Sequence, residues 1–133
     1  FSEDVFQFIK EEKVKKNNIT LHLKKDFDND FIQLAKELNN FYSLRSSKKL
    51  EWLKWKYNHY IEKKKFYVIK IYKDQNFIGF IAMVSNIEKK YNFKKLSLVE
   101  IVISDKDNYI LNDTLKYCID IAKKFNFDID LIL

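Results

Sequence analysis

Residues 77–84, FIGFIAMV, are the stretch that most constrains the fold, because all eight side chains are apolar or absent. A half-exposed strand would alternate apolar and polar residues, so this run predicts a central strand covered on both faces. It also contains Gly79, the only glycine in the 133-residue chain. Because Gly79 lacks a Cβ, a helix or a ligand can approach the sheet there; a bulge or a packing accommodation is the alternative.

The segments around this run predict a mixed sheet. Residues 66–72, FYVIKIY, form a second β pattern that is joined to the run by the polar turn 73–76. Residues 96–104, LSLVEIVIS, form a third, and a helix at 110–125 and a strand at 127–133 follow. A helical crossover joins parallel strands with a right-handed connection. We therefore predict an α/β fold with an antiparallel meander, a crossover helix and a parallel last strand.

The N-terminal half is predicted to be mainly helical. Residues 1–18 are interpreted as a helical extension, with the helix itself over residues 3–16. The alternating segment ITLHL (19–23) predicts a strand. Amphipathic patterns then predict one helix at about 29–42 and another from about 46 to 59.

Composition narrows the function classes. The net charge is +6, but 24 of the 25 basic residues are Lys and only Arg45 is Arg. Because bidentate recognition of bases and phosphates favours Arg, a solvated lysine surface is favoured over a nucleic-acid site. The single cysteine, Cys118, excludes an internal disulfide, and with no secretion signal or membrane-length apolar run it favours the cytoplasm. His22 and His59 are far apart in sequence, so no metal site is predicted.

From strand 19–23 onward, the element order resembles that of the Gcn5-related N-acyltransferase (GNAT) superfamily. FIGFIAMV is similar to the third strand of that family, which carries a glycine between apolar residues. The resemblance covers about residues 19–133 as a GNAT-like domain. Since the chain stops at what would be the fifth strand, the resemblance implies that the C-terminal part of the domain is missing.

A second motif is LEWLKWKYNHY (50–60). It resembles the second helix of GNAT-like proteins from surface-polysaccharide and cell-wall biosynthesis, which carry a Trp-basic-Tyr signature. In this chain the signature is Trp55, Lys56 and Tyr57. Aromatic side chains on this helix are candidates to line an acceptor pocket, with core packing as the alternative for the inward members. The candidate substrate-binding residues are Trp52, Trp55, Tyr57 and Tyr60.

Glu100 is the candidate catalytic residue. The alternation in LSLVEIVI places it on one face with Leu98 and Val102. Loss of water there favours the neutral carboxyl and suits a general base acting near neutral pH. In the resembled family a carboxylate on this strand deprotonates the acceptor amine. The alternative is that Glu100 faces solvent or pairs with a lysine.

The resemblance implies acetyl-CoA or another acyl-CoA as co-substrate, and no metal. Backbone N–H groups of the third strand would pair with the pantetheine arm, and the next helix would receive the pyrophosphate. The family turn Gln/Arg-x-x-Gly-x-Gly/Ala is replaced by residues 104–113, SDKDNYILND, which lack glycine. Asp105, Asp107 and Asp113 in this segment would repel phosphate, so the use of acyl-CoA stays open. The candidate cofactor-binding residues are Ile101, Val102, Ile103, Lys106 and Asn108.

The leading expectation is an acyl-CoA-dependent N-acyltransferase acting on an amino sugar or other surface-glycan precursor. A small-molecule amine would attack the thioester directly. One alternative is a non-catalytic GNAT-like module, whose last strand a partner domain or second copy would cover. Another is half of a two-domain aminoacyl-tRNA-dependent transferase, which shares the fold without the CoA loop. A general nucleic-acid binder would require a steep salt dependence.

Overall fold

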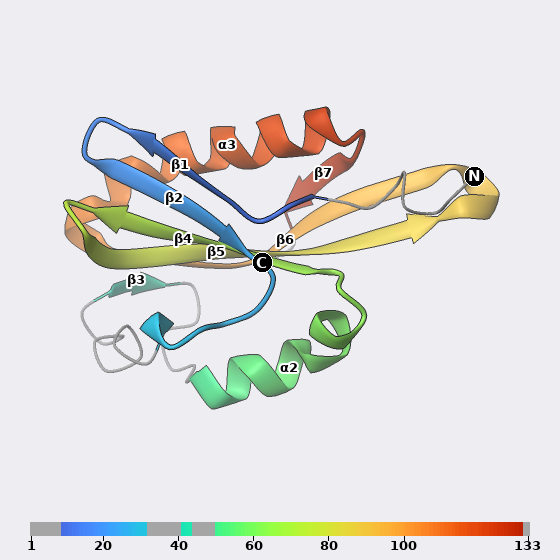
Figure 1. Ribbon diagram of the computed structural model, residues 1–133, viewed down its shortest axis with the longest axis horizontal. Coiled ribbons are helices and arrows are strands. Elements are labelled where there is room, and N and C mark those ends of the chain that lie inside the picture. The colour runs from blue at the N-terminus through green and yellow to red at the C-terminus, as the bar shows by residue number, and fades with distance from the viewer. Residues whose placement is uncertain (1–8, 32–40, 44–49, 132–133) are drawn as a thin grey trace.

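The computed structural model of the chain describes residues 9–31, 41–43 and 50–131 (Figure 1). The strands are β1 (Glu12–Lys16), β2 (Ile19–Lys24), β3 (Phe41–Ser43), β4 (Phe66–Lys73), β5 (Asn76–Glu88), β6 (Phe93–Ser104) and β7 (Asp128–Leu131). The helices are α2 (Leu50–Glu62) and α3 (Leu111–Lys124), with short 3-10 helices η3 (Lys89–Tyr91) and η4 (Asp105–Ile110). The strands form one sheet in the order β1-β2-β4-β5-β6-β3, with β7 also paired to β6. α3 covers one face of this sheet and α2 the other (Figure 1).

The predicted meander and parallel last strand are confirmed. β4 pairs antiparallel with β5, and β5 pairs antiparallel with β6. Asp74 and Gln75 adopt positive φ in the hairpin turn between β4 and β5, as residues of tight hairpin turns do. α3 then carries the chain to β7, which runs parallel to β6 with Ile129 opposite Leu96.

The helix predicted over residues 3–16 is corrected where the structure describes it. Residues 12–16 form β1, which pairs antiparallel with β2 and places Val14 opposite Leu21. All five β1 side chains are exposed. A helix in this segment would therefore bury no apolar face, whereas a strand gains backbone hydrogen bonds to β2. Residues 41–43 form β3 rather than the end of the helix predicted at 29–42. Residues 1–8 and 32–40 of these predictions lie outside the described residues.

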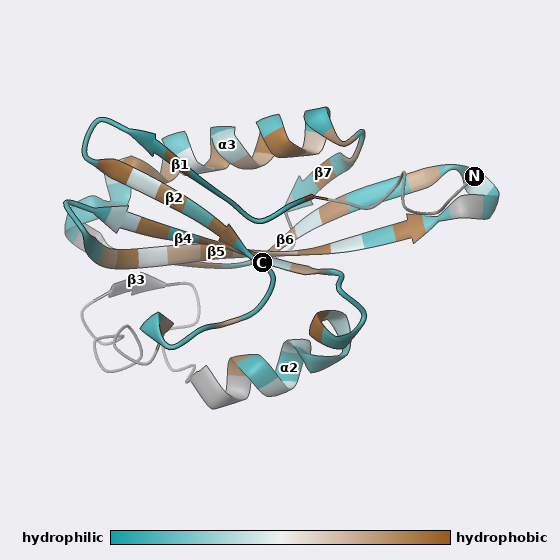
Figure 2. Cartoon of the chain, viewed as in Figure 1, coloured by the Kyte–Doolittle hydropathy of each residue, from teal (hydrophilic) through white to brown (hydrophobic). Residues whose placement is uncertain are grey.

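The sheet is buried on both faces, as the FIGFIAMV run predicts. The face under α3 is a cluster that includes Ile69, Ile81 and Met83. The face toward α2 is a second cluster that includes Val68 and Phe80. Figure 2 shows hydrophobic residues along the central strands β4 and β5. Residues on both faces of β5 therefore leave water on folding, which is the main stabilising contribution to this sheet.

The two described helices each bury one side. α3 buries Cys118, Ile121 and Ala122, and Lys123 and Lys124 lie in its last turn, where the helix dipole favours cations. Burial raises the pKa of the Cys118 thiol to about 12, so this cysteine packs as a small apolar residue. Neither α2 nor α3 has the length and apolar content that a bilayer-spanning segment needs.

Gly79 is explained by the close approach of a neighbouring strand. A Cβ at this position would lie 2.3 Å from the Val102 carbonyl oxygen and 2.7 Å from the Ile103 Cα atom. The register of β5 against β4 also shifts here, between Ile71 and Tyr72. The packing alternative therefore accounts for the glycine: the β6 backbone occupies the space that a side chain would need.

A bulge in β6 reverses its side-chain alternation. Ala82 lies opposite Glu100 and the next residue of β5 lies opposite Leu98, so Val99 is an extra residue in β6. Leu98 packs into the α3-side cluster, whereas Val102 packs into the α2-side cluster. The prediction that Glu100 shares a face with Leu98 is therefore wrong, because Val99 shifts the alternation by one residue. Glu100 and Val102 do share a face.

Candidate active site

Glu100 is buried in contact with two residues of the Trp-basic-Tyr signature. Only 4% of Glu100 is exposed, and its Oε2 atom accepts a 2.5 Å hydrogen bond from the Tyr57 hydroxyl. The Lys56 Nζ atom lies 3.3 Å from the same oxygen, and 30% of the Lys56 side chain is exposed. The lysine pairing considered as the alternative is thus present. The pairing also compensates a carboxylate whose burial alone would be costly.

The helical period of α2 explains how these two residues reach Glu100. Leu53 and Tyr57, four residues apart, are buried in the α2-side cluster. The Tyr57 ring also packs against Phe66 of β4, with the ring centroids 5.5 Å apart. This packing holds the Tyr57 hydroxyl toward β6. Lys56 lies next to Tyr57 at the side of the helix, where its amine can contact both Glu100 and water.

In the part of the chain that the structure describes, the outer edge of β6 has a gap beside Glu100. β7 pairs with residues 95–98, and β3 pairs with residues 102–104. Among the described residues, 99–101 have no strand partner on this edge. The candidate pantetheine positions are therefore divided: Ile101 lies in the gap, whereas Val102 and Ile103 pair with β3. Within the described residues, an extended ligand can reach the strand at this gap without displacing another strand.

The candidate acceptor residues of α2 lie on different sides of the helix. Tyr57 faces Glu100, and the half-buried Tyr60 packs against the same cluster. Trp55 is exposed and faces away from the sheet, and the side chain of Trp52 lies outside the described residues. Trp55 borders an open hollow of about 580 Å³ on the outer face of α2. The other residues that line this hollow are Lys54, Lys56, Asn58, His59 and Glu62.

The segment in which a pyrophosphate was expected is η4, which precedes α3. Lys106 and Asn108, both candidate cofactor-binding residues, are exposed there. Asp113, in the first turn of α3, is exposed as well, and the side chain of Asp105 lies outside the described part of the chain. Lys106 is thus available to an anion, while Asp113 opposes one.

Asp107 is already paired. It is buried, and its Oδ1 atom lies 3.1 Å from the Lys73 Nζ atom. Hydrogen bonding to Tyr109 and to Asp107 raises the pKa of Lys73, so this lysine remains charged. The Oδ2 atom of Asp107 has no hydrogen-bond partner among the described residues. This carboxylate therefore fastens η4 to the end of β4 and does not face solvent.

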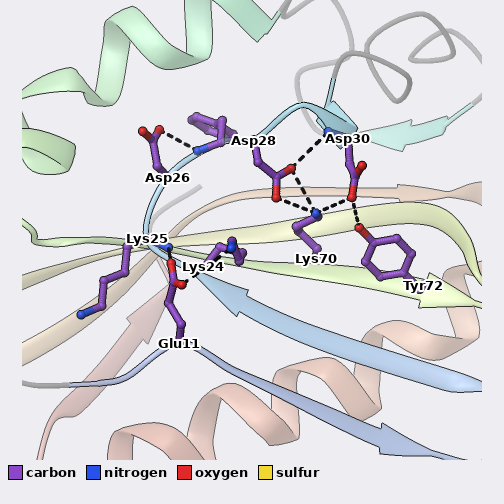
Figure 3. A network of polar contacts seen from close by, with 9 residues as sticks. Glu11, Lys24, Lys25, Asp26, Asp28, Asp30, Lys70 and Tyr72 are labelled. Carbon is purple, nitrogen blue, oxygen red and sulfur yellow. Dashed lines mark hydrogen bonds and ion pairs between the residues drawn. The ribbon is translucent and has the colours of Figure 1, made fainter.

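A second charged cluster, absent from the sequence predictions, lies on the same face of the sheet (Figure 3). Lys70 of β4 is 1% exposed, and its Nζ atom lies 2.8 Å from Asp28 Oδ2 and 2.7 Å from Asp30 Oδ2. The Tyr72 hydroxyl also donates to Asp30. Burial alone lowers the pKa of Lys70, but its hydrogen bonds to Asp28 and Asp30 raise it above the usual value.

The sequence signal for this cluster is Lys70 itself, a lone charge at the centre of the apolar run FYVIKIY. A buried lysine is rare unless it is paired, so its position implies carboxylate partners without naming them. No group of three or more His, Cys, Asp or Glu side chains suited to a metal ion occurs within the described ranges.

Comparison with known proteins concerns the fold. No protein-family model and no curated protein matches the chain. A ribosomal-protein-alanine N-acetyltransferase from Brucella melitensis biovar Abortus matches with 11% identity and a TM-score of 0.59, over 86% of this chain and 79% of that one. A GNAT family acetyltransferase from Staphylococcus aureus matches with 18% identity and a TM-score of 0.55, over 88% of this chain and 87% of that one.

A third solved structure is an aminoglycoside acetyltransferase from an uncultured soil metagenomic sample, in complex with trehalose. It matches with 10% identity and a TM-score of 0.52, over 87% of this chain and 78% of that one. All three similarities extend over most of both chains. The chain therefore has the fold of the GNAT acetyltransferases.

Proposed function

We propose that the protein is an N-acyltransferase that moves an acyl group from a thioester, in the first instance acetyl-CoA, to a primary amine. The observation that carries this proposal is the buried Glu100 carboxylate beside the gap at residues 99–101 of β6. A positioned base next to a strand edge that can hold an extended ligand is what direct amine acylation needs. The GNAT fold supports the same reaction class.

In this mechanism the amine nitrogen attacks the thioester carbonyl, the C–S bond breaks, and the thiolate leaves. Glu100 accepts the proton that the amine loses. Tyr57 holds the Glu100 carboxylate in place through its hydrogen bond. The gap at residues 99–101 suits an extended pantetheine arm, and η4 offers Lys106 to the pyrophosphate. Since η4 has no glycine-rich turn, we expect the pyrophosphate to add little to donor binding.

The acceptor we propose is an amino sugar or another amine-bearing precursor of a surface glycan, handled in the cytoplasm. The resemblance of residues 50–60 to helices of polysaccharide-biosynthesis proteins supports this acceptor class. Trp55 also supports it, because an exposed indole beside Asn58 and His59 can stack on a sugar ring while polar groups bind its hydroxyls. The single cysteine, which leaves no internal disulfide to form, supports a reducing compartment.

The test compares two acetyl donors with a panel of amines that includes glucosamine. We expect acetyl-CoA to raise the melting temperature, because a ligand that binds only the folded state stabilises it. We also expect turnover with at least one amine. S-acetyl-pantetheine, which lacks the nucleotide and pyrophosphate, should support turnover within about ten-fold of acetyl-CoA, about 1.4 kcal/mol. If millimolar donor produces no thermal shift and no turnover, the proposed function is rejected.

A second candidate is an aminoacyl-tRNA-dependent transferase. It is favoured by the absence of glycine in η4 and by the Lys73–Asp107 ion pair that fastens this segment. Such an enzyme uses an ester donor without a CoA pyrophosphate. Transfer from aminoacyl-tRNA, together with no transfer from acetyl-CoA, would select this candidate over the first.

A further inference from the structure

Lys56 lies where the acceptor amine of the proposed reaction would be expected. A general base acts on an amine within hydrogen-bond reach, about 2.6–3.2 Å. The Lys56 Nζ atom is 3.3 Å from Glu100 Oε2, close to that range. It is a primary alkylamine, the same chemical class as the acceptor. It also reaches solvent, unlike the Glu100 carboxylate that it contacts.

We propose that Lys56 is a self-acylation site, at which the protein transfers an acyl group from a thioester donor to its own side chain. This inference rests on the proposed N-acyltransferase function. Glu100 takes a proton from the Lys56 ammonium, and the neutral nitrogen attacks the thioester carbonyl. A C–N bond forms as the C–S bond breaks. The nitrogen loses its second proton to solvent, and the thiolate leaves as a free thiol after protonation.

The modification changes the charge balance around Glu100. An acylated lysine carries no charge, so it can no longer form the ion pair with the carboxylate. The Glu100 Oε2 atom would keep its hydrogen bond from Tyr57, and an external amine could take the place beside it that the Lys56 ammonium had occupied. Self-acylation would therefore replace the Lys56 ammonium beside Glu100 with a substrate amine.

Other lysines provide internal controls. Lys54 is exposed on the same helix and reports acylation that needs no base. Burial lowers the pKa of Lys94, whose Nζ atom donates a 2.6 Å hydrogen bond to the Phe125 carbonyl oxygen. Lys94 reports uncatalysed reaction at a lysine that loses its proton more easily. Lys70 is enclosed by two carboxylates and is expected to stay unmodified.

The experiment incubates the intact protein with isotopically labelled acetyl-CoA and follows acetylation of each lysine by peptide mass spectrometry. We expect Lys56 to be acetylated about 10²-fold faster than Lys54 or more, at a first-order rate that does not depend on protein concentration. Glu100→Gln should lower the Lys56 rate toward the Lys54 rate, a loss of about 10²-fold or more if the base contributes as usual. The acetylation rate of Lys54, and likewise that of Lys94, should be the same in the wild type and in Glu100→Gln.

The outcomes separate this inference from the proposed function. Turnover of an external amine with no preferential acetylation of Lys56 would overturn self-acylation and leave the N-acyltransferase function intact. Acetylation of Lys56 at the Lys54 rate, or at a rate unchanged by Glu100→Gln, would overturn it as well. No turnover and no acetylation at Lys56 would reject both proposals. Urea denaturation of the Glu100→Gln protein checks that it is folded.

Discussion

The two lysine–carboxylate sites on the α2 face of the sheet are built in opposite ways. At Lys70 the cation is buried, 1% exposed, while the side chains of its partners Asp28 and Asp30 are 34% and 55% exposed. At Glu100 the anion is buried and its partner Lys56 reaches water. A buried charge needs its partner, whereas the exposed member of a pair can be exchanged at little cost. Lys70 is therefore suited to hold residues 28–30 against β4. Glu100 is suited to be a buried carboxylate whose exposed partner can be exchanged.

The largest effect is expected from Glu100→Gln. If Glu100 is the base, turnover should fall by about 10²–10⁴-fold. Stability should change by less than about 1 kcal/mol, because the Gln amide oxygen can accept the Tyr57 hydrogen bond. The measurement is kcat together with urea denaturation, with Glu88→Gln at the exposed end of β5 as the matched control. Turnover within a few-fold of the wild type would show that Glu100 is not the general base.

Lys70→Met should produce the largest loss of stability and little loss of catalytic rate per folded molecule. Breaking a buried ion pair costs about 3–5 kcal/mol, and we expect about 2–3 kcal/mol here because both carboxylates reach water. Urea denaturation measures the change. The control is Lys24→Met, which removes a half-exposed lysine 3.6 Å from Glu11 and should cost at most about 0.5 kcal/mol. Equal losses in the two variants would contradict a fastening role for Lys70.

Two tyrosine variants sharpen the comparison at the level of a single hydroxyl. Tyr57→Phe removes the donor to the buried Glu100 carboxylate and should cost about 1–2 kcal/mol of stability. Tyr72→Phe removes the donor to the more exposed Asp30 carboxylate and should cost about 0.5 kcal/mol. Thermal or urea denaturation tests the order. A larger loss of stability for Tyr72→Phe would show that the tyrosine hydrogen bond contributes more beside Lys70 than beside Glu100.

The smallest expected effect is a pH dependence at the Lys70 site. Hydrogen bonds from Lys70 and then from Tyr72 lower the pKa of Asp30 below its ordinary value of 3.8. The stabilisation is therefore fully present above that value and is lost as the pH falls through the lowered folded-state pKa. Asp30→Asn should flatten the acid limb of stability against pH. Asp74→Asn, in the β4–β5 turn, is the control, and an equal flattening by both would exclude Asp30 as the cause.

An alkaline limb should appear at the same site. Burial, followed by the hydrogen bond to Asp30, raises the pKa of Tyr72 to about 12 from 10.0. Because the folded state retains this proton, the stabilisation is present below pH 10 and is lost as the pH rises toward 12. Tyr72→Phe should remove this part of the alkaline limb in urea denaturation measured between these pH values. An unchanged limb would assign it to lysine deprotonation.

Strong local patterns in the sequence predicted most of the fold. The doubly apolar run FIGFIAMV, the β-rich FYVIKIY and the amphipathic pattern of α3 each matched the observed element, because side-chain periodicity alone decides which surfaces can be buried. The sequence also named Tyr57 and Glu100 as candidate site residues, but it did not predict the contact between them. Lys70, a lone lysine in an apolar strand, carried a further signal that the sequence predictions did not use.

The tertiary structure decided what depends on pairing between distant segments. Residues 12–16 became β1 because β2 offered an edge, which no helical pattern within those residues can report. The extra residue Val99 in β6 turned Glu100 toward α2, since a bulge is defined by register against β5 and not by local composition. The choice of Lys56 for Glu100, and of Asp28 and Asp30 for Lys70, likewise followed from packing. Charged groups pair when they are close in space, and the separation of two residues in the sequence does not determine that distance.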